Sequence, residues 1–445
     1  MRALWSIGLL ALYTVAAVVP AHAASHADAG GVLERRAREV ADLISEAPTW
    51  PDDLLATSFT AQVKPGQLRA IGMQYFAQCG AVMEVQPTSA KGEHSGTFDL
   101  ITSKGMVVPL TLALSDTPPH EVVGLLFGLP SPMLKGLDEA VSAMRALGGQ
   151  VSFGVWSLGD GPPTPVATLD PDRSLAIGSA FKLHVLGALI GEVKAGQRSI
   201  ADVVPLLPQY KSLPSGQMQD WPDGSPVTLA TAANLMISVS DNTATDLLIA
   251  TLGRERVEAA MGAMGVADPA RTTPFLTTAE MFLLKFVGDG ARAREYAPLD
   301  AAGRREFLAK SPLGGPISMD ALNASALAQP MLVDSIEWFA SASDLARTMD
   351  WIRVQTEGDP ESALMQVRNA LSINRGLSIS SRQFRWVGFK GGSEPGAINL
   401  TYLLQSADGT WYALAATWND PARSLDEGKF AALVQRTIYV LGTAR

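Results

Sequence analysis

Hydrophobic and polar positions change their period along the chain, and each change predicts a different element. Residues 32–45 combine apolar and charged positions as an amphipathic helix does, and "WPDD" then breaks the pattern. The segment "QLRAIGMQYFAQCG" repeats apolar residues at helical spacing from Leu68 to Phe76, and Gly80 stands where a helix ends. We therefore expect helices at the start of the folded chain.

From residue 81 the pattern changes to a period of two, which is typical of strands. Four such segments follow one another: "AVMEVQ", "GTFDLIT", "MVVPLTLALS" and "EVVGLLFGL". Between two of them, Ser103-Lys104-Gly105 has the composition of a hairpin turn. Helices followed by a small antiparallel sheet predict an α+β domain, which we place at residues 27–130.

A second domain is predicted after a linker helix at residues 131–147. Gly148-Gly149 ends that helix, and "VSFGVWSLGD" and "TPVATLD" follow as paired strands. The pattern is then mostly helical from 179 to about 384. Strands return as "FRWVGFK", "AINLTYLLQ" and "WYALAATW", the last two joined at Asp408-Gly409. Strands at both ends of a helical segment predict one sheet built from the two ends of a single domain, residues 148–445, which a last helix closes.

The composition is that of a globular protein. The chain has 445 residues, of which 47% are hydrophobic and 18% charged. That is enough apolar material for a large core and too little charge for a disordered or coiled-coil protein. The formal net charge is −9 and the pI is about 5.2, so we expect no nucleic-acid partner, which would need a basic face.

The first residues resemble a secretory signal peptide. Arg2 precedes the apolar run "ALWSIGLLALYTVAAVV", and "AHA" at 21–23 has the small residues of a cleavage site. We predict that residues 1–23 are removed and that the mature protein is periplasmic or secreted, with no stable membrane span. An uncleaved anchor is the alternative, because the run is near the shortest length that spans a bilayer.

The residue inventory argues against several kinds of site. The chain has five histidines, and the four after residue 23 show no H-x-H or H-x-x-x-H spacing, so no metal site built on clustered histidines is expected. No GxGxxG or P-loop pattern occurs, and we predict no cofactor. Cys79 is the only cysteine, and its apolar setting at a helix end predicts a buried packing role.

A serine nucleophile with a histidine base is also disfavoured. His184, the only histidine after residue 120, lies five positions after Ser179, about 140° around a helix, so the two side chains point apart. Ile177 occupies the first position of a G-x-S-x-G elbow. Lys182 is better placed, because at i+3 it shares a helix face with Ser179 and can reach its hydroxyl. Burial among apolar groups lowers the pKa of a lysine, so we predict that Lys182 accepts the proton of Ser179.

Two further motifs make this pair specific. Ser240-Asp241-Asn242 is an S-D-N triplet between apolar segments, and Lys390-Gly391-Gly392 ends a predicted strand. The order S-x-x-K, S-D-N, K-x-G resembles class A β-lactamases and penicillin-binding proteins. The resemblance covers residues 147–445. It implies a β-lactamase-like α/β domain, with an antiparallel sheet from both ends of the domain and a helical subdomain, in a chain that is α+β as a whole.

The resemblance implies a role for each motif residue. Ser179 is the acylated nucleophile, and Lys182 is its base. Ser240 hands a proton to the leaving group, while Asn242 holds the substrate amide and contacts Lys182. Lys390 adds positive charge that shapes the proton relay and attracts an anionic substrate.

The K-G-G segment also contributes backbone groups. The resemblance implies an oxyanion hole made by the N–H groups of Ser179 and of Ser393, which follows Gly392. Asp241 is expected to be structural, with its side chain bonded to local backbone.

Two departures from the family pattern bear on the substrate. Gly391 stands where most relatives carry a hydroxyl that helps to bind a substrate carboxylate, and Ser393 is the candidate to replace it. Class A β-lactamases also use a loop glutamate to activate water for deacylation. Glu255 and Glu258 are most simply a solvated helix face, and Glu280 aligns with the segment after that loop. The deacylating glutamate is therefore predicted to be missing.

These features predict an exported serine hydrolase that acts on a small ester, a β-lactam or a peptidoglycan-derived substrate. Without the loop glutamate, a β-lactam acyl-enzyme should hydrolyse slowly, so esterase-like or weak β-lactamase activity is favoured. Two alternatives share the motifs. One is a β-lactam or peptidoglycan binder (a sensor or penicillin-binding protein) that acylates without turnover, and the other is a D,D-peptidase.

The first domain, together with an insertion over 296–349, indicates a particular subgroup of these hydrolases. The α+β unit is similar to NTF2 and steroid-isomerase-like domains. Its pairing with the second domain resembles two-domain β-lactamase-fold serine hydrolases related to an enzyme of clavulanic acid biosynthesis. Asp99 and Tyr75 are the only candidates for a second active site in the first domain, and a packing or cleft-covering role is the preferred interpretation.

Overall fold

The computed structural model describes residues 29–443 except 91, 288–289 and 311–327. The predicted signal peptide, residues 1–23, lies outside this part of the chain, as does a segment of the predicted insertion. Contacts divide the described residues into two compact units, with the division between Lys135 and Gly136. Residues 428–437 group with the first unit and residues 438–443 with the second. None of the described helices is long and apolar enough to cross a membrane.

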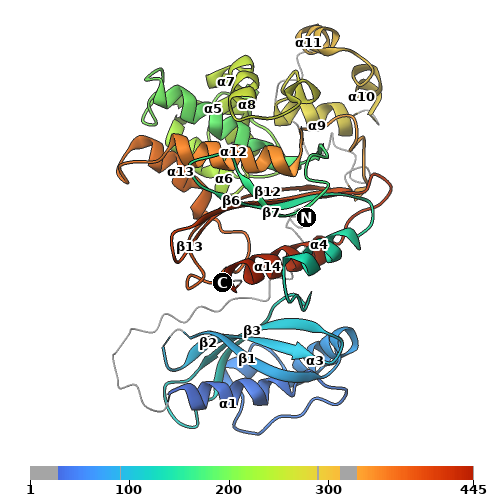
Figure 1. Cartoon of the computed structure of the whole chain (residues 1–445), viewed down its shortest axis with the longest axis vertical. Helices are drawn as coiled ribbons and strands as arrows, with labels where there is room; N and C mark the ends of the chain where they lie inside the picture. The colour runs from blue at the N-terminus through green and yellow to red at the C-terminus, as the bar shows by residue number, and fades with distance from the viewer. Residues whose placement is uncertain (1–28, 91, 288–289, 311–327, 444–445) are drawn as a thin grey trace. The chain divides into compact units, whose positions relative to one another are not determined.

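The first unit has the helices and the antiparallel sheet that the sequence pattern predicts (Figure 1). Its sheet has the strand order β1-β2-β3-β4, and β5 pairs with β3. The turn that joins β2 to β3 falls at the predicted Ser103-Lys104-Gly105. The elements are α1 (Ala29–Ala41), α2 (Thr57–Thr60), α3 (Pro65–Cys79), β1 (Val82–Ala90), β2 (Ser95–Thr102), β3 (Met106–Leu114), β4 (Val122–Phe127) and β5 (Ser131–Pro132).

The core of this unit lies between α1, α3 and the inner face of the sheet. Its members include Leu33 and Val40 from α1 and Phe98 and Leu110 from the strands, all of them buried. Cys79, the last residue of α3, is fully buried in the same core, which confirms its predicted packing role. Burying each such apolar side chain contributes about 1.5–3 kcal/mol.

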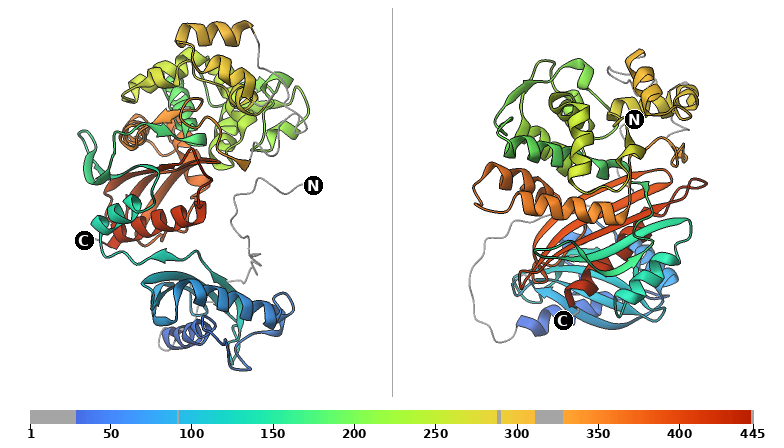
Figure 2. Two further views of the ribbon diagram at one scale, coloured as in Figure 1. Left: turned by 90° about the vertical axis from the view of Figure 1, so that its right-hand side faces the viewer. Right: turned by 45° about the horizontal axis from the view of Figure 1, so that its top comes forward.

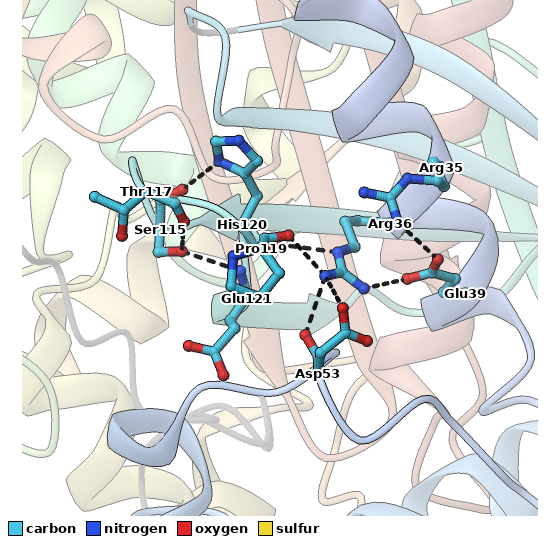
Figure 3. A network of polar contacts seen from close by, with 9 residues as sticks. All are labelled: Arg35, Arg36, Glu39, Asp53, Ser115, Thr117, Pro119, His120 and Glu121. Carbon is cyan, nitrogen blue, oxygen red and sulfur yellow. Dashed lines mark hydrogen bonds and ion pairs between the residues drawn. The ribbon is translucent and has the colours of Figure 1, made fainter.

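One charged residue of α1 is buried with the apolar ones. Arg36 is 1% exposed and donates to the carbonyl oxygens of Asp53 (3.0 Å), Pro119 (2.7 Å) and His120 (3.1 Å). Its guanidinium also binds the carboxylates of Glu39 (2.6 Å) and Asp53 (3.0 Å) (Figure 3). Because a guanidinium offers five donors in a planar fork, this one side chain connects α1 to two loops.

Replacing Arg36 by lysine should therefore destabilise the first unit. Lysine keeps the charge but has three donors on one nitrogen, so buried carbonyls lose their partners and the free energy of unfolding falls by about 2–4 kcal/mol. Urea unfolding followed by tryptophan fluorescence measures the loss. The matched control is Arg35→Lys, where the side chain is 52% exposed and forms an ion pair with Glu39 at 3.3 Å. Equal stability of the two variants would contradict the structural role of Arg36.

The second unit is organised around one five-stranded antiparallel sheet with the order β12-β13-β14-β6-β7. Strands from both ends of the domain thus lie side by side, as predicted, and β14 pairs with β6 over its whole length. The hairpin between β13 and β14 turns at Asp408-Gly409. The strands are β6 (Gln150–Leu158), β7 (Thr164–Leu169), β12 (Phe384–Glu394), β13 (Ala397–Ser406) and β14 (Trp411–Asn419).

The helices of this unit form the predicted helical subdomain. In Figure 1 and in both views of Figure 2, those between β8 and β12 gather on one side of the sheet. They are α5 (Lys182–Lys194), α6 (Leu229–Ser238), α7 (Asn242–Leu252), α8 (Arg254–Ala263), α9 (Thr278–Phe286), α10 (Ala291–Tyr296), α11 (Ala301–Lys310), α12 (Ala342–Gln355) and α13 (Ala363–Ile373). The helix α4 (Leu137–Arg145) packs on β6 and β7, and α14 (Glu427–Thr443) follows the last strand.

Two separate two-stranded sheets complete the second unit. The pairs are β8 (Leu175–Ala176) with β11 (Phe339–Ala340), and β9 (Val203–Pro205) with β10 (Pro226–Thr228).

Helix α5 occupies the middle of the subdomain. Every residue from Lys182 to Ile190 is buried, and α5 contacts α6, α7, α8, α12 and α13. An apolar pattern on all sides of a helix is the pattern of a fully buried helix. The fold therefore places the amine of Lys182 inside the protein, at the end of α5 that faces the sheet.

Candidate active site

The turn that carries Ser179 lies between β8 and α5. Residues Gly178–Phe181 form a 3-10 turn, so α5 begins only at Lys182. Two contacts hold this turn: the N–H of Ile177 donates to the carbonyl of Trp338 (3.0 Å), and the rings of Phe181 and Trp338 stack with centroids 3.7 Å apart. Ser179 itself is partly exposed between buried neighbours. The turn thus presents one hydroxyl to solvent from a rigid base.

Lys182 is completely buried and makes three hydrogen bonds. Its Nζ donates to the carbonyl of Ser240 (2.6 Å), to Ser240 Oγ (3.0 Å) and to Asn242 Oδ1 (2.7 Å). The predicted contact between Lys182 and Asn242 is therefore present. None of the three bonds goes to Ser179, so a direct bond between the amine and the serine hydroxyl stays a prediction. The structure connects Lys182 to the S-D-N motif first.

Ser240 links the two lysines of the motif set. Its Oγ accepts from Lys182 and from Lys390 Nζ (3.1 Å), and its backbone has φ of +56°. A non-glycine residue in this left-handed region is strained and persists only where its surroundings hold it. Ser215 supplies part of that hold, because its hydroxyl donates to the Ser240 carbonyl (2.7 Å). The strain indicates that the position of the Ser240 hydroxyl matters.

The other two residues of the triplet bond to Lys182 and to the surrounding backbone. Asn242 directs its amide oxygen at Lys182 and donates its Nδ2 to the carbonyl of Leu213 (2.9 Å). Asp241 is fully buried, caps α7 by accepting from Ala244 N (2.8 Å), and also accepts from two backbone N–H groups of the loop before α6. The predicted structural role of Asp241 agrees with these bonds.

Burial changes the protonation of both lysines. It lowers the pKa of Lys182 well below its ordinary value, and the charge of Lys390 lowers this pKa further, while Asp241 and Asp246 act in the opposite direction. Burial also lowers the pKa of Lys390 to about 7. Two amines that share one hydroxyl in a dry site do not both keep their protons easily, so a neutral amine is accessible near neutrality.

The backbone of the K-G-G segment touches the nucleophile turn. A Cβ added to Gly392 would lie 2.2 Å from the Ile177 carbonyl oxygen and 2.3 Å from the Ser179 nitrogen. From the other side, Gly178 has φ of +47°, and a Cβ there would lie 3.1 Å from the nitrogen of Ser393. Glycines at both positions thus allow the close approach, and they bring together the peptide groups of Ser179 and Ser393, the predicted oxyanion donors.

The surroundings of Gly391 are crowded. A Cβ at this position would lie 2.8 Å from the ring of Phe389 and 3.1 Å from the Asn399 carbonyl oxygen, so a side chain here would require the Phe389 ring to shift. The candidate replacement, Ser393, is exposed, but its side chain hydrogen-bonds Glu427 at the start of α14. The hydroxyl expected to replace the missing one therefore bonds a carboxylate.

The three candidate glutamates, Glu255, Glu258 and Glu280, each pair with an arginine. Glu255 is 76% exposed, as predicted. Glu258, predicted to be solvated, is instead 13% exposed and accepts from Phe275 N (2.8 Å) while pairing with Arg305. Glu280 caps α9 and pairs with Arg254 (2.7 Å). The prediction for Glu258 was wrong because its partners come from segments distant in sequence.

A buried carboxyl that the sequence did not single out positions α9. Asp246 of α7 accepts from the N–H groups of Thr278 (2.7 Å) and Ala279 (3.0 Å), and burial raises its pKa to about 7. The only sequence feature that could have indicated its burial is that it is a single acidic residue in an apolar helix. The carboxyl connects α7, the helix that begins at Asn242, to α9.

In the first unit, the two candidate residues for a second active site are also engaged. The Tyr75 hydroxyl donates to the carbonyls of Phe127 and Gly128, each at 3.2 Å. Asp99 is paired with Arg436 (2.8 Å), which groups with the same unit. These bonds are those of residues that stabilise a fold.

A comparison with protein families agrees with the motif order. Residues 136–356 match the sequence model of the family described as the beta-lactamase enzyme family. This part of the chain belongs to the β-lactamase enzyme family. It has the fold of the serine hydrolases of that family, which is consistent with acyl-enzyme chemistry. No curated protein matches the chain significantly.

Solved structures of β-lactamase-family proteins are similar to the chain at low identity. A β-lactamase from Sphaerobacter thermophilus DSM 20745 is 22% identical, with a TM-score of 0.47, and the match covers 69% of this chain and 95% of that one. The class A β-lactamase PenP from Rhodopseudomonas palustris is 16% identical (TM-score 0.46; 69% and 98%). PBP-A is 15% identical (TM-score 0.45; 71% and 98%). Likenesses at this level describe similarity and say nothing of the reaction.

Proposed function

We propose that the protein is an exported serine hydrolase, periplasmic or secreted, that forms an acyl-enzyme on Ser179 with an ester or a β-lactam. The observation that carries this proposal is the state of Lys182. Lys182 is a fully buried amine that directly follows the turn carrying Ser179. Because its pKa is lowered, the neutral form that can accept a proton is accessible. The hydrogen-bond partners of Lys182 are neutral oxygens, so no carboxylate bonded to the amine opposes the loss of its proton.

The acylation step uses the residues as follows. Neutral Lys182 takes the proton of Ser179 while Oγ attacks the carbonyl carbon, so that a C–O bond forms and an electron pair moves onto the carbonyl oxygen. The N–H groups of Ser179 and Ser393 stabilise this oxyanion. The bond to the leaving oxygen or nitrogen then breaks as that atom takes a proton from Ser240, which is resupplied by Lys182 or Lys390.

Two features favour a neutral ester over an anionic β-lactam. The Phe389 ring crowds the position of Gly391, where most relatives carry the carboxylate-binding hydroxyl, and Ser393 bonds Glu427. Glu255, Glu258 and Glu280 are engaged elsewhere, so no glutamate among them activates water for a trapped β-lactam acyl group. Esterase-like turnover with slow β-lactam release is the activity that fits. The same features support the second candidate, a β-lactam or peptidoglycan binder that acylates without turnover.

A substrate panel separates these functions. The substrates are p-nitrophenyl butyrate, nitrocefin and a peptide ending in D-Ala-D-Ala, each with the wild type and with Ser179→Ala. We expect sustained ester hydrolysis and a nitrocefin burst followed by a slow phase, both lost in Ser179→Ala. A stoichiometric burst with every substrate would establish the non-turnover binder instead. Release of D-Ala faster than ester hydrolysis would establish the D,D-peptidase.

The lowered pKa of Lys390 predicts a pH-dependent stability. Because its folded pKa of about 7 is below the ordinary 10.5, the unfolded chain binds more protons between these two values, so stability rises with pH across that window. Lys390→Met removes the buried charge. Its gain in unfolding free energy over the wild type should be largest below pH 7 and shrink toward pH 10.5. Urea unfolding at several pH values measures it, and Lys194→Met, at an exposed position, is the control. A gain independent of pH would contradict the shifted pKa.

We also infer that the first unit is an NTF2-like α+β domain with a packing or cleft-covering role. Its helices and its antiparallel sheet of four main strands support this inference, as do the structural bonds of Asp99 and Tyr75. The relation to an enzyme of clavulanic acid biosynthesis stays a prediction.

A further inference from the structure

A third buried lysine, besides Lys182 and Lys390, has two glutamates around it. Lys285 Nζ is 2.6 Å from Glu337 Oε1 and 2.6 Å from Glu394 Oε1. The side chains of Lys285 and Glu337 are 0% exposed and that of Glu394 is 8% exposed. No family motif includes these residues, and the acylation step above does not use them.

Each member of the cluster is joined to a different part of the active site. Glu394 ends β12 and directly follows Ser393, a proposed oxyanion donor. Glu337 precedes Trp338, whose carbonyl accepts from Ile177 and whose ring stacks on Phe181 of the nucleophile turn.

Lys285 completes the connection from the side of the S-D-N motif. It lies on α9, and the first turn of α9 is bound by Asp246 from the helix that begins at Asn242. The cluster thus connects three segments: the oxyanion strand, the nucleophile turn and the helix pair that carries the S-D-N motif.

The charges of the cluster do not balance unless a proton is present. One ammonium and two carboxylates would leave a net negative charge in a dry site, which is costly. Glu394 Oε2 is buried and has no hydrogen-bond partner among the described residues, so no donor stabilises a negative charge on this oxygen. The charged groups that act on Glu394 are Glu337 and Lys285. Burial and the charge of Glu337 raise the pKa of Glu394 well above its ordinary value, which agrees with the geometry.

We propose that Lys285, Glu337 and Glu394 form a positioning cluster that holds the Ser393 end of β12 against the nucleophile turn, with one proton shared by the two carboxyl groups. The proposal rests on the proposed function, since the group that it positions is an oxyanion donor. Loss of the cation leaves β12 free to move by a fraction of an ångström. Because oxyanion donors act on the transition state, such a shift lowers kcat more than it changes KM.

The first test concerns the proton and needs no substrate. Infrared difference spectra between the wild type and Glu394→Gln at pH 7 should show the C=O stretch of a protonated carboxyl in the wild type only. Glutamine reproduces the shape of that carboxyl, so the variant is expected to fold. Stability adds a second readout: because the folded pKa of Glu394 is raised, wild-type stability falls as pH rises above the ordinary glutamate pKa, and Glu394→Gln gains on the wild type over that range. Absence of the band would overturn the shared proton.

The second test concerns positioning. Lys285→Met should lower kcat for the ester on the order of 10²-fold per site labelled by a fluorophosphonate, with KM nearly unchanged. The control is Arg353→Met, which breaks a largely buried ion pair with Asp350 within α12. That variant should lose stability and keep its kcat per labelled site.

The outcomes separate the cluster from the proposed function. If Lys285→Met behaves like the control, the cluster is only a packing device and the positioning role is wrong. If the wild type takes no label at all, the proposed function fails, and the infrared and stability measurements still decide whether the shared proton exists.

Discussion

Lys182→Arg is expected to be almost inactive, with an acylation rate lowered about 10⁴-fold, although it keeps the positive charge. The reason is the proton. A guanidinium does not lose its proton in a protein, whereas the amine of Lys182, with its pKa lowered first by burial and then by Lys390, can do so. If the lysine acted only through its charge, the arginine variant would retain activity. Stopped-flow measurement of the ester burst gives the acylation rate.

Two further variants distinguish the loss of the base from misfolding of the arginine variant. Lys182→Met has nearly the shape of the neutral lysine and should be as slow as the arginine variant. In Lys182→Ala, added primary amines should restore part of the rate, increasingly as their pKa approaches the assay pH. Arginine or methionine variants with near-normal acylation would exclude Lys182 as the base.

Gly392→Ala should have the second-largest effect. The added Cβ would lie 2.2 Å from the Ile177 oxygen and 2.3 Å from the Ser179 nitrogen, both of them backbone atoms that cannot rotate away. The strand and the nucleophile turn must therefore separate. We expect the ester kcat/KM to fall about 10³-fold because both oxyanion donors move, and the unfolding free energy to fall by about 1–3 kcal/mol from overpacking.

A glycine on α5 is the matched control for this substitution. Gly191 lies in α5, and a Cβ there would meet no atom within 4 Å. Gly191→Ala should therefore keep full activity and gain about 0.5–1 kcal/mol from helix propensity. Steady-state kinetics and urea unfolding of the two variants test the difference. If Gly392→Ala matched Gly191→Ala in both, the close contact between β12 and the serine turn would be refuted.

The sequence pattern predicted the second unit's sheet well, for a physical reason. A buried sheet needs apolar strands, and the sequence Asp408-Gly409 strongly favours a tight hairpin turn. Local residues were therefore enough to place β13 and β14. The motif order likewise located Lys182, Ser240 and Asn242, which the fold brings within hydrogen-bonding distance.

The rest of the site depends on contacts between distant segments, which local pattern does not record. Glu258 was expected in solvent because its own helix is polar, but Phe275 and Arg305 come to it from other segments. The bond from Ser215 that supports Ser240 has no local signal either. The 3-10 turn before Lys182 was also not foreseen, and it changes the predicted helix face shared with Ser179.

The most direct measurement of the central claim is intact-protein and peptide mass spectrometry after incubation with a fluorophosphonate and with a penicillin. We predict one adduct per chain, located on the peptide that contains Ser179. It should be absent from Ser179→Ala and form far more slowly in Lys182→Met. A folded wild type that takes no adduct, or one that takes it at another residue, would contradict an acyl-enzyme on Ser179 with Lys182 as its base.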